Sequence, residues 1–264
     1  MKFTVDHEKV YYPGYNNHTL VGELFKPQSP HSCPGILFCH GICTSRAEFR
    51  EFAEKLSSRG LLVLIFDYSG HGESQGTRSL FTSASHREDT LASIARLKKE
   101  QPSAITVLGH SFGVKAALDA GVSSEAVDKV ILVAPRGRSG GGLKGFRRLA
   151  FRAIGLGYAI LPFLPDIYLD CPRTPTEKIS LRLTRYANSI NNLEVAQQLE
   201  KPCLTIAGLH DHDVTVKDAL EVFHGLKHPQ KNWLLLENSG HSPFNEADQE
   251  LLLGEIAQFC GNAP

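Results

Sequence analysis

The sequence has no excess of charge of either sign and no long apolar segment. Its 264 residues include 28 Lys plus Arg and 28 Asp plus Glu, so the net charge is zero. A neutral chain offers nucleic acid no global attraction, and we expect no nucleic-acid partner. No run approaches the ~18 uninterrupted apolar residues of a membrane-spanning helix, and the first residues lack the apolar core of a secretory signal. These absences predict a cytoplasmic globular protein.

Paired cysteines are also missing. The six cysteines form no C-x-x-C pair, so the sequence gives no sign of a redox motif or of a zinc site of that spacing. An even number of cysteines in a chain of this length, without a secretory signal, is typical of reduced thiols in the cytosol. We also find no internal repeat and no low-complexity tail.

Apolar runs alternate with amphipathic stretches along most of the chain, which is the pattern of strands followed by helices. The predicted buried strands cover residues 35–39, 61–66, 104–108, 129–134, 203–207 and 233–236. Two more strands, at 3–12 and 19–25, flank a turn-rich segment and are predicted to be antiparallel. The alternation predicts an α/β fold with a mostly parallel sheet and helices on both faces. Ligands are then expected beyond the carboxyl ends of the strands.

The alternation breaks between residues 136 and 199. We therefore predict one domain over 1–264, with its core in 1–135 and 200–264 and an inserted lid of short helices at 136–199. Six basic residues precede the first acid of this segment, Asp166. A solvated basic face is the simplest explanation, and transient contact with a membrane surface or attraction of an anionic substrate are the alternatives. We expect Phe146 and Phe163 to contact substrate, and the sequence leaves the oligomeric state open.

The pentapeptide at 109–113, Gly-His-Ser-Phe-Gly, joins a predicted strand to a helical stretch. A strand, then G-x-S-x-G, then a helix is the context of a nucleophile elbow, in which the glycines leave room for a serine on a tight turn. We predict that Ser111 is a nucleophile and that the Phe112 N–H is an oxyanion donor. The alternative is a chance match in a glycine-rich turn, and the flanking strand and helix argue against it.

A serine nucleophile needs a base and a group that orients the base. His241 directly follows the last predicted strand and is the predicted base. Asp211 and Asp213 follow the preceding strand, and the order Ser, Asp, His suits either of them. Position favours Asp211, and Asp213 is the alternative. The run His-Asp-His-Asp at 210–213 also resembles metal ligands, but no spaced third ligand follows, so we predict no metal site.

The turn that follows the 35–39 strand supplies the remaining predicted site residues. Its Ile42 N–H is the expected second oxyanion donor. We expect His40 and Gly41 from this turn, together with His110 from the elbow, to contact substrate.

These motifs, together with the Asp-x-x-Gly-His-Gly-x-Ser stretch at 67–74, resemble the α/β-hydrolase fold superfamily. That stretch is similar to the branch that holds monoacylglycerol lipases, small carboxylesterases and S33 aminopeptidase-like hydrolases. The resemblance covers nearly the whole chain outside the predicted lid. It implies that the Gly-His-Gly-x-Ser part is a structural turn, so His71 is not expected to be catalytic. It also implies a mechanism without a metal or organic cofactor.

The residues and the resemblance together predict a serine hydrolase that cleaves a small acyl ester or a monoglyceride-like ester through an acyl-enzyme on Ser111. Hydrolysis of a thioester, of a peptide with a free N-terminus or of a C–C bond by the same three residues is the alternative. The basic lid argues against a peptide amine. A non-catalytic binding protein on this fold is disfavoured, because all the expected catalytic positions are filled.

Overall fold

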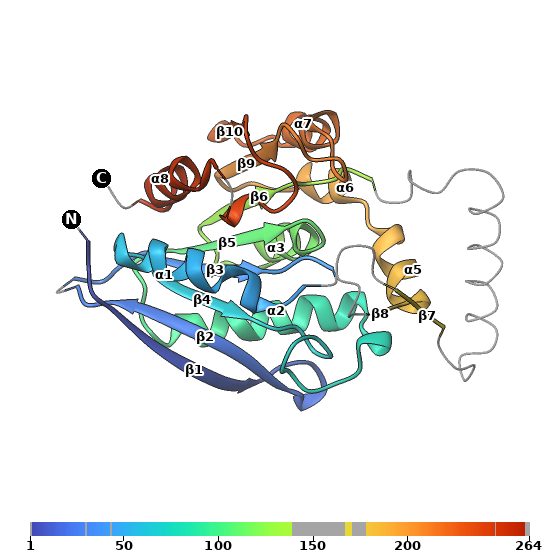
Figure 1. Ribbon diagram of the computed structural model, residues 1–264, viewed down its shortest axis with the longest axis horizontal. Helices are drawn as coiled ribbons and strands as arrows, with labels where there is room; N and C mark the ends of the chain where they lie inside the picture. Colours follow the sequence, from blue (N-terminus) through green and yellow to red (C-terminus); the bar gives the residue numbers. More distant parts are fainter. Residues whose placement is uncertain are drawn as a thin grey trace.

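The computed structural model describes residues 2–29, 31–42, 44–138, 167–170, 178–245 and 247–261. Eight strands form one sheet in the order β1-β2-β4-β3-β5-β6-β9-β10 (Figure 1). The strands are β1 (Val5–Pro13), β2 (Thr19–Pro27), β3 (Gly35–Cys39), β4 (Leu62–Phe66), β5 (Ile105–His110), β6 (Lys129–Val133), β9 (Cys203–Gly208) and β10 (Lys231–Leu236). β2 pairs antiparallel with β1 and β4, and all the other neighbours are parallel. The prediction of a mostly parallel sheet that begins with an antiparallel pair is confirmed.

Helices cover both faces of this sheet, as the alternation predicted. The described α-helices are α1 (Arg50–Ser58), α2 (Ser83–Lys98), α3 (Gly113–Ser123), α5 (Leu181–Ser189), α6 (Asn192–Ala196), α7 (Val216–Gly225) and α8 (Gln249–Cys260). Short 3-10 turns lie at Tyr15–Asn17 (η1), Arg46–Phe49 (η2), Arg78–Leu80 (η3) and Pro243–Asn245 (η4).

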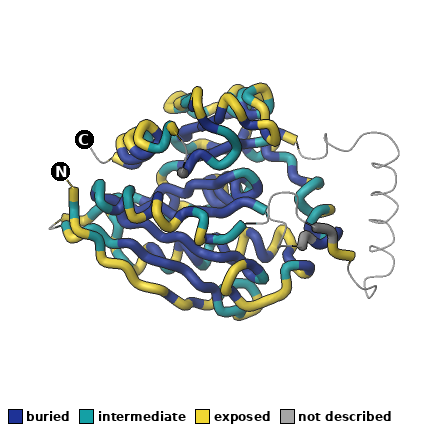
Figure 2. Tube along the Cα trace, viewed as in Figure 1, coloured by how far each residue is buried: buried dark blue, intermediate teal, exposed yellow. Residues whose placement is uncertain are grey.

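Buried apolar side chains gather in two clusters, one on each face of the sheet. In β3, Ile36 and Phe38 belong to the cluster that includes residues of α1 and α8. Leu37 and Cys39 belong to the cluster that includes residues of α2 and α3. Because successive side chains of a strand point to opposite faces, a strand buried on both faces reads as one continuous apolar run. Figure 2 shows the central strands as the most buried part of the chain.

The largest difference from the predicted elements is the start of α2. The helix pattern predicted residues 88–100, whereas α2 begins five residues earlier, at Ser83. Thr82 caps it, since its side chain accepts a hydrogen bond from the Ser85 N–H. The first turns bury the polar residues His86 and Asp89 rather than apolar ones. A search for apolar periodicity therefore misses the first five residues of the helix.

The predicted lid, 136–199, is described only in part. Its described elements are α5, α6 and a two-stranded antiparallel hairpin, β7 (Tyr168–Asp170) with β8 (Lys178–Ser180). The hairpin was not predicted. In Figure 1, α5 lies at one end of the sheet, and both chain termini lie at the other. Phe146 and Phe163 lie outside the described residues.

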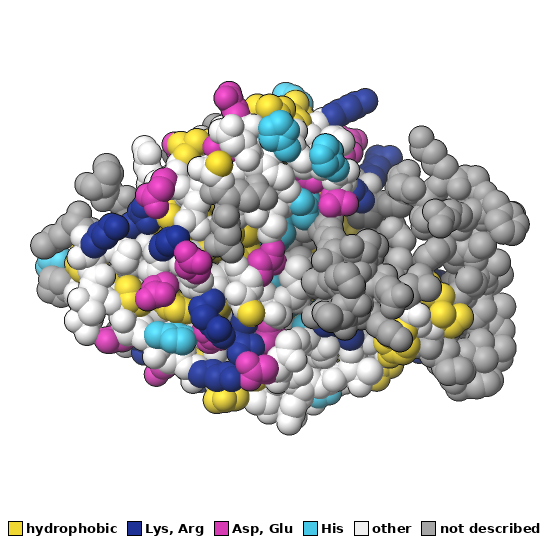
Figure 3. Space-filling view, viewed as in Figure 1, with side chains coloured by type: hydrophobic (Ala, Val, Ile, Leu, Met, Phe, Trp, Pro, Cys, Tyr) yellow, Lys and Arg dark blue, Asp and Glu magenta, His cyan; other side chains and the backbone are white. Residues whose placement is uncertain are grey.

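Among the described residues, no helix combines the length and the apolar character needed to cross a bilayer. On the face seen in Figure 3, Lys and Arg side chains lie interspersed with Asp and Glu side chains. This mixed surface agrees with the neutral net charge of the sequence.

Candidate active site

Ser111 sits on a sharp turn between β5 and α3. Its φ is +54°, in the left-handed region, which costs a non-glycine residue ~1–2 kcal/mol. The Ser111 N–H donates to the Val133 carbonyl of the neighbouring strand at 2.9 Å and fixes the turn. A Cβ on Gly109 would overlap the Gly113 carbonyl oxygen, and a Cβ on Gly113 would overlap that of Cys39. The two glycines of the motif are therefore required by close backbone contacts.

The structure brings Ser111, His241 and Asp211 together as a hydrogen-bonded chain. His241 Nε2 lies 2.9 Å from Ser111 Oγ, and His241 Nδ1 lies 2.7 Å from Asp211 Oδ2. In this arrangement Nδ1–H donates to the carboxylate, which leaves Nε2 as the acceptor that faces the serine hydroxyl. Three residues from the ends of β5, β9 and β10 thus form the geometry that a serine nucleophile requires.

The Asp211 carboxylate is buried and held on both oxygens. Its Oδ1 accepts from the backbone N–H groups of Asp213 and Val214, each at 2.8 Å. Burial alone would raise the pKa of Asp211, but hydrogen bonds from His241 and from these two amides outweigh burial and lower it. The carboxylate therefore stays charged where it can orient the imidazole. Asp213 is exposed and contributes its backbone amide, so the acid that bonds to His241 is Asp211, the one that its position in the sequence favoured.

The loop that carries His241 is fixed from two directions. Asp248 accepts from the Asn238 N–H and from the Ser239 hydroxyl, both at 2.8 Å. His110 Nε2–H donates to the His241 carbonyl at 2.8 Å. The imidazole is therefore oriented by contacts to its own backbone as well as by Asp211.

The residues that carry the two predicted oxyanion donors line the same cavity. Ser111, His241, Ile42 and Phe112 all line a cavity of about 250 Å³. Among the described residues, neither the Ile42 N–H nor the Phe112 N–H donates to a protein acceptor. Two free amides beside a serine hydroxyl can hold the negative charge of a tetrahedral intermediate.

The direction of the Ile42 N–H is fixed through the other end of its peptide group. The Gly41 carbonyl accepts from His40 Nδ1–H at 2.8 Å and from the Thr44 hydroxyl at 3.0 Å. Since C=O and N–H point in opposite directions across a trans peptide, anchoring the carbonyl aims the N–H. The Ser111 carbonyl likewise accepts from the Val114 N–H at 3.2 Å, which turns the Phe112 N–H the other way.

The side chains of His40 and His110 are fully buried behind the cavity and are not part of its wall. His40 Nε2 accepts from the Tyr68 N–H at 3.2 Å, and burial lowers the pKa of His40, which keeps the ring neutral. Gly41 contributes through its carbonyl. These three residues, which were predicted to contact substrate, therefore lie behind the residues that line the cavity. His71 is also buried, with its Nδ1–H donating to the Ser69 carbonyl at 3.1 Å, which is the structural role that the resemblance implied.

A buried ion cluster lies next to the turn at residues 40–42, which carries the predicted oxyanion donor Ile42. Arg46 lies four residues after Ile42, is only 3% exposed, and forms ion pairs with Asp67, Glu73 and Glu23. Asp67 also accepts from the Arg46 N–H at 2.8 Å. Sequence reasoning missed this cluster. The available signal was an acid at the end of β4 with a second acid six residues later, but nothing local marks Arg46 as their partner.

The rest of the cavity wall comes largely from the predicted lid and was also missed. The wall residues from the segment 136–199 are Arg136, Thr184, Ala187, Asn188, Ile190 and Asn192. A hydrogen bond joins two distant parts of this segment, since the Asn192 side-chain amide donates to the Arg136 carbonyl at 2.8 Å. No pattern in the sequence singles out these residues, because they become neighbours only when α5 and α6 fold over the sheet.

Among the described residues, one group has the proximity that a metal site needs. Ligand atoms of Asp211, Asp213 and His241 lie within 4.8 Å of one another. Two of these residues already bond to each other, and a bound ion would compete with the hydrogen bond from His241 to Asp211. His241 Nδ1 and Asp211 Oδ2 are therefore already used by each other.

A comparison of the sequence with models of protein families matches residues 30–167 to the family described as serine aminopeptidase, S33. The matched stretch is more than half of the 264 residues and includes both the turn at residues 40–42 and the turn at residues 109–113.

Curated relatives match the chain either over a short stretch or at low sequence identity. The chain is 36% identical over 95 residues to quorum-quenching protein AidA of Acinetobacter baumannii, which covers 34% of this chain and 31% of AidA. It is 25% identical over 213 residues to esterase EstD of Thermotoga maritima, which covers 75% of this chain and 52% of EstD. The chain therefore matches less than two thirds of the length of either relative.

Among solved structures, the α/β hydrolase GrgF from Penicillium sp. sh18 has a similar fold. The TM-score is 0.82 at 22% sequence identity, and the match covers 97% of this chain and 98% of GrgF. At this identity the likeness establishes the α/β-hydrolase fold that the motifs predicted.

Proposed function

Because the chain belongs to the serine aminopeptidase S33 family of α/β hydrolases, we propose that it hydrolyses carboxylic esters through an acyl-enzyme on Ser111. The observation that carries this proposal is the hydrogen-bonded chain from Ser111 Oγ through His241 to Asp211, with links of 2.9 and 2.7 Å. That chain opens onto a cavity that Ile42 and Phe112 also line, and neither backbone amide has a protein acceptor in the part of the chain that the structure describes. The likeness to an esterase among the relatives agrees with this reaction class.

The proposed reaction proceeds in two halves. Ser111 Oγ attacks the ester carbonyl carbon as His241 Nε2 takes the hydroxyl proton, and the Ile42 and Phe112 amides bind the oxyanion. The intermediate collapses, His241 gives the proton to the leaving alcohol, and the acyl group remains on Ser111. Water then attacks this acyl-enzyme with His241 as the base, and the acid is released. Each oxyanion donor contributes ~3 kcal/mol to such a transition state.

The test is covalent labelling combined with turnover. We expect a fluorophosphonate probe to modify Ser111 in the wild type, and short p-nitrophenyl esters to be hydrolysed. Ser111→Ala is expected to lose both. Ser123→Ala is the matched control, because Ser123 is exposed on α3 and donates only to the Asp119 carbonyl. Labelling or turnover that survives in Ser111→Ala would refute the proposal.

Cleavage of a peptide with a free N-terminus is the second candidate, and Asp213 is the observation that favours it. Asp213 lines the cavity, and its carboxylate lies within 4.8 Å of the His241 ligand nitrogen. A carboxylate there is suited to bind a substrate ammonium group. Asp213→Asn separates the two candidates: an aminopeptidase would lose turnover of aminoacyl p-nitroanilides, whereas an esterase would keep turnover of uncharged p-nitrophenyl esters.

A further inference from the structure

Phe112 has an aromatic environment that the reaction itself does not explain. Its ring stacks on the ring of His86 with centroids 4.5 Å apart and an interplanar angle of 8°. The Tyr186 ring packs edge-on against it, with centroids 5.6 Å apart at 80°. Phe81 lies at 6.2 Å. The ring whose backbone N–H is a proposed oxyanion donor is therefore enclosed by aromatic side chains, and it is 8% exposed.

His86 is held rigidly in this stack. It lies in the first turns of α2 and is 1% exposed. Its Nδ1 forms a hydrogen bond of 3.0 Å with the Tyr186 hydroxyl. The Tyr68 ring also packs against the His86 ring in an edge-on arrangement, with centroids 4.7 Å apart at 82°. Burial, with a smaller contribution from Lys115, lowers the pKa of His86 well below its ordinary value, so the ring is neutral. A neutral ring stacks on Phe112 without placing a cation there.

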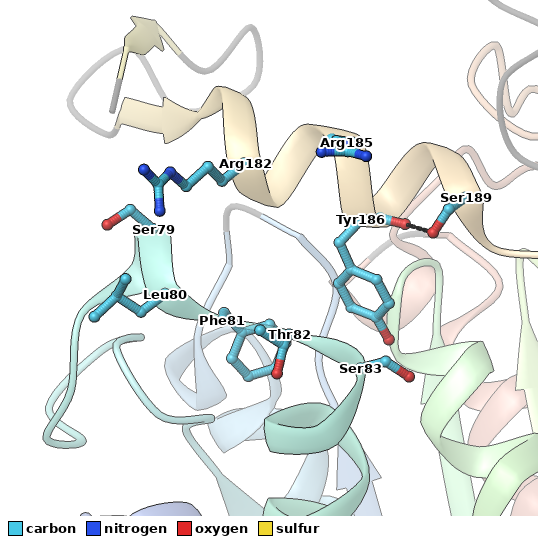
Figure 4. Close-up of a pocket in the computed structure, with 9 residues that line it drawn as sticks. All are labelled: Ser79, Leu80, Phe81, Thr82, Ser83, Arg182, Arg185, Tyr186 and Ser189. Atoms are coloured by element: carbon cyan, nitrogen blue, oxygen red, sulfur yellow. Dashed lines mark hydrogen bonds between the residues drawn. The ribbon is translucent and has the colours of Figure 1, made fainter. Parts of the chain in front are cut away.

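Tyr186 links this stack to the cavity wall. It lies on α5, and the neighbouring residues Thr184, Ala187 and Asn188 of the same helix line the cavity above Ser111. Figure 4 shows Tyr186 reaching from α5 toward Phe81 and toward Ser83 at the start of α2. One rigid helix thus carries both a wall of the substrate cavity and a hydrogen bond to the side chain that supports Phe112.

We propose that His86 and Tyr186 are positioning residues that link the docking of α5 to the orientation of the Phe112 N–H. With α5 docked, the hydrogen bond between Tyr186 and His86 fixes the His86 ring, and the stack fixes the Phe112 side chain. The Ser111–Phe112 peptide is then held with its N–H toward the cavity. Without that hydrogen bond, the stack loosens and the oxyanion donor is less well aimed. This inference rests on the proposed function, because it assigns the Phe112 N–H an oxyanion.

The test removes the hydrogen bond and keeps the rings. Tyr186→Phe deletes only the hydroxyl, and His86→Phe preserves a stacking ring without a hydrogen-bonding atom. A neutral hydrogen bond contributes about 1 kcal/mol, which corresponds to about fivefold in rate. We therefore expect each variant to lower kcat about fivefold on p-nitrophenyl acetate with KM unchanged. Tyr186→Phe also removes the hydrogen bond between the tyrosine hydroxyl and Ser83. The double variant is expected to lose no more than Tyr186→Phe alone, because that substitution already removes the bond that His86→Phe removes.

Tyr12→Phe is the matched control. Tyr12 is buried, and its hydroxyl pairs at 2.9 Å with Ser93 on the same helix α2. The control therefore removes an equivalent hydroxyl contact with α2 but touches no residue of the stack. We expect it to lower thermal stability to a similar extent and to leave kcat unchanged. An equal loss of kcat in Tyr12→Phe, additive losses in the double variant, or a change confined to KM would each overturn the inference.

A second readout separates this inference from the proposed function. In protein labelled with [¹⁵N]phenylalanine, the Phe112 amide signal is expected to shift in Tyr186→Phe and His86→Phe and to stay in place in Tyr12→Phe. A wild type that hydrolyses no ester and resists fluorophosphonate would end the proposed function, and the amide signal would still decide whether Tyr186 controls the Phe112 peptide. An unmoved signal in Tyr186→Phe would end the inference alone.

Discussion

Replacing Asp211 by asparagine is the sharpest test of how the site works. The carboxylate binds three donors: the Asp213 and Val214 amides on Oδ1, and the His241 imidazole on Oδ2. In Asp211→Asn, the side-chain oxygen is expected to remain with the two amides, because they can only donate. The new NH₂ group then faces His241 Nδ1, so the ring must present a bare nitrogen there and carry its proton on Nε2.

The expected loss in kcat of Asp211→Asn follows from this change in the tautomer of His241. An imidazole protonated on Nε2 cannot accept the proton of the Ser111 hydroxyl, which lies 2.9 Å away. In a serine protease triad the equivalent substitution lowers kcat about 10⁴-fold. At about 1.36 kcal/mol for each factor of ten, the loss is ~5.4 kcal/mol of transition-state stabilisation. Because the substitution is isosteric and keeps both amide hydrogen bonds, we expect little change in folding or in KM.

The assay is steady-state hydrolysis of p-nitrophenyl acetate, with circular dichroism to verify the fold. Asp213→Asn is the comparison variant, since its carboxylate is exposed and its contact with Asp211 is made by the backbone amide. We expect that variant to stay within about threefold of the wild type on this ester. The reasoning would be refuted by an Asp211→Asn enzyme that keeps more than a tenth of the wild-type kcat, or by an equal loss in Asp213→Asn.

Three further predictions concern the supports of the site. Thr44→Val removes one of the two hydrogen bonds to the Gly41 carbonyl, which orient the Ile42 N–H. It should lower kcat about threefold to tenfold in stopped-flow acylation assays, with KM unchanged. Gly113→Ala should abolish activity and lower the melting temperature, because the alanine Cβ would overlap the Cys39 carbonyl oxygen. Gly254→Ala is the control. Residue 254 lies in α8 with open space around it, so this substitution should be neutral or stabilise the fold by ~0.5–1 kcal/mol. Burial would raise the pKa of Glu23, but hydrogen bonds and charges from Arg50 and Arg46 outweigh burial and lower the pKa from 4.5 to about 2. The stabilisation of the folded state by the Glu23 carboxylate is therefore complete above pH 4.5 and declines as pH falls toward 2. Urea unfolding between pH 7 and 3 measures that slope, which should be flatter in Glu23→Gln, and an unaltered slope would show that this carboxylate does not control acid stability.

The sequence by itself determined the elements that depend on residues close together along the chain. The elbow at 109–113 needs its glycines because backbone atoms approach too closely for a Cβ. The strand Gly35–Cys39 was readable because a strand buried on both faces has no polar position. The order of the elbow, Asp211 and His241 along the chain was also readable, since a parallel sheet brings the carboxyl ends of its strands to one edge. The exact start of α2 was not, because polar side chains fill its buried face.

The tertiary structure decided what depends on contacts between distant segments. The sequence favoured Asp211 over Asp213 by position alone, and the 2.7 Å contact shows which of the two carboxylates bonds to His241. His40 and His110 were expected to contact substrate, and their burial behind the cavity follows from hydrogen bonds that only the folded backbone provides. The contact of Tyr186 with His86 joins residues 100 positions apart. A sequence specifies local geometry directly, whereas the pairing of remote side chains is an outcome of how the whole chain packs. The sharp turn at Ser111 was therefore predictable, and the contacts that support it were not.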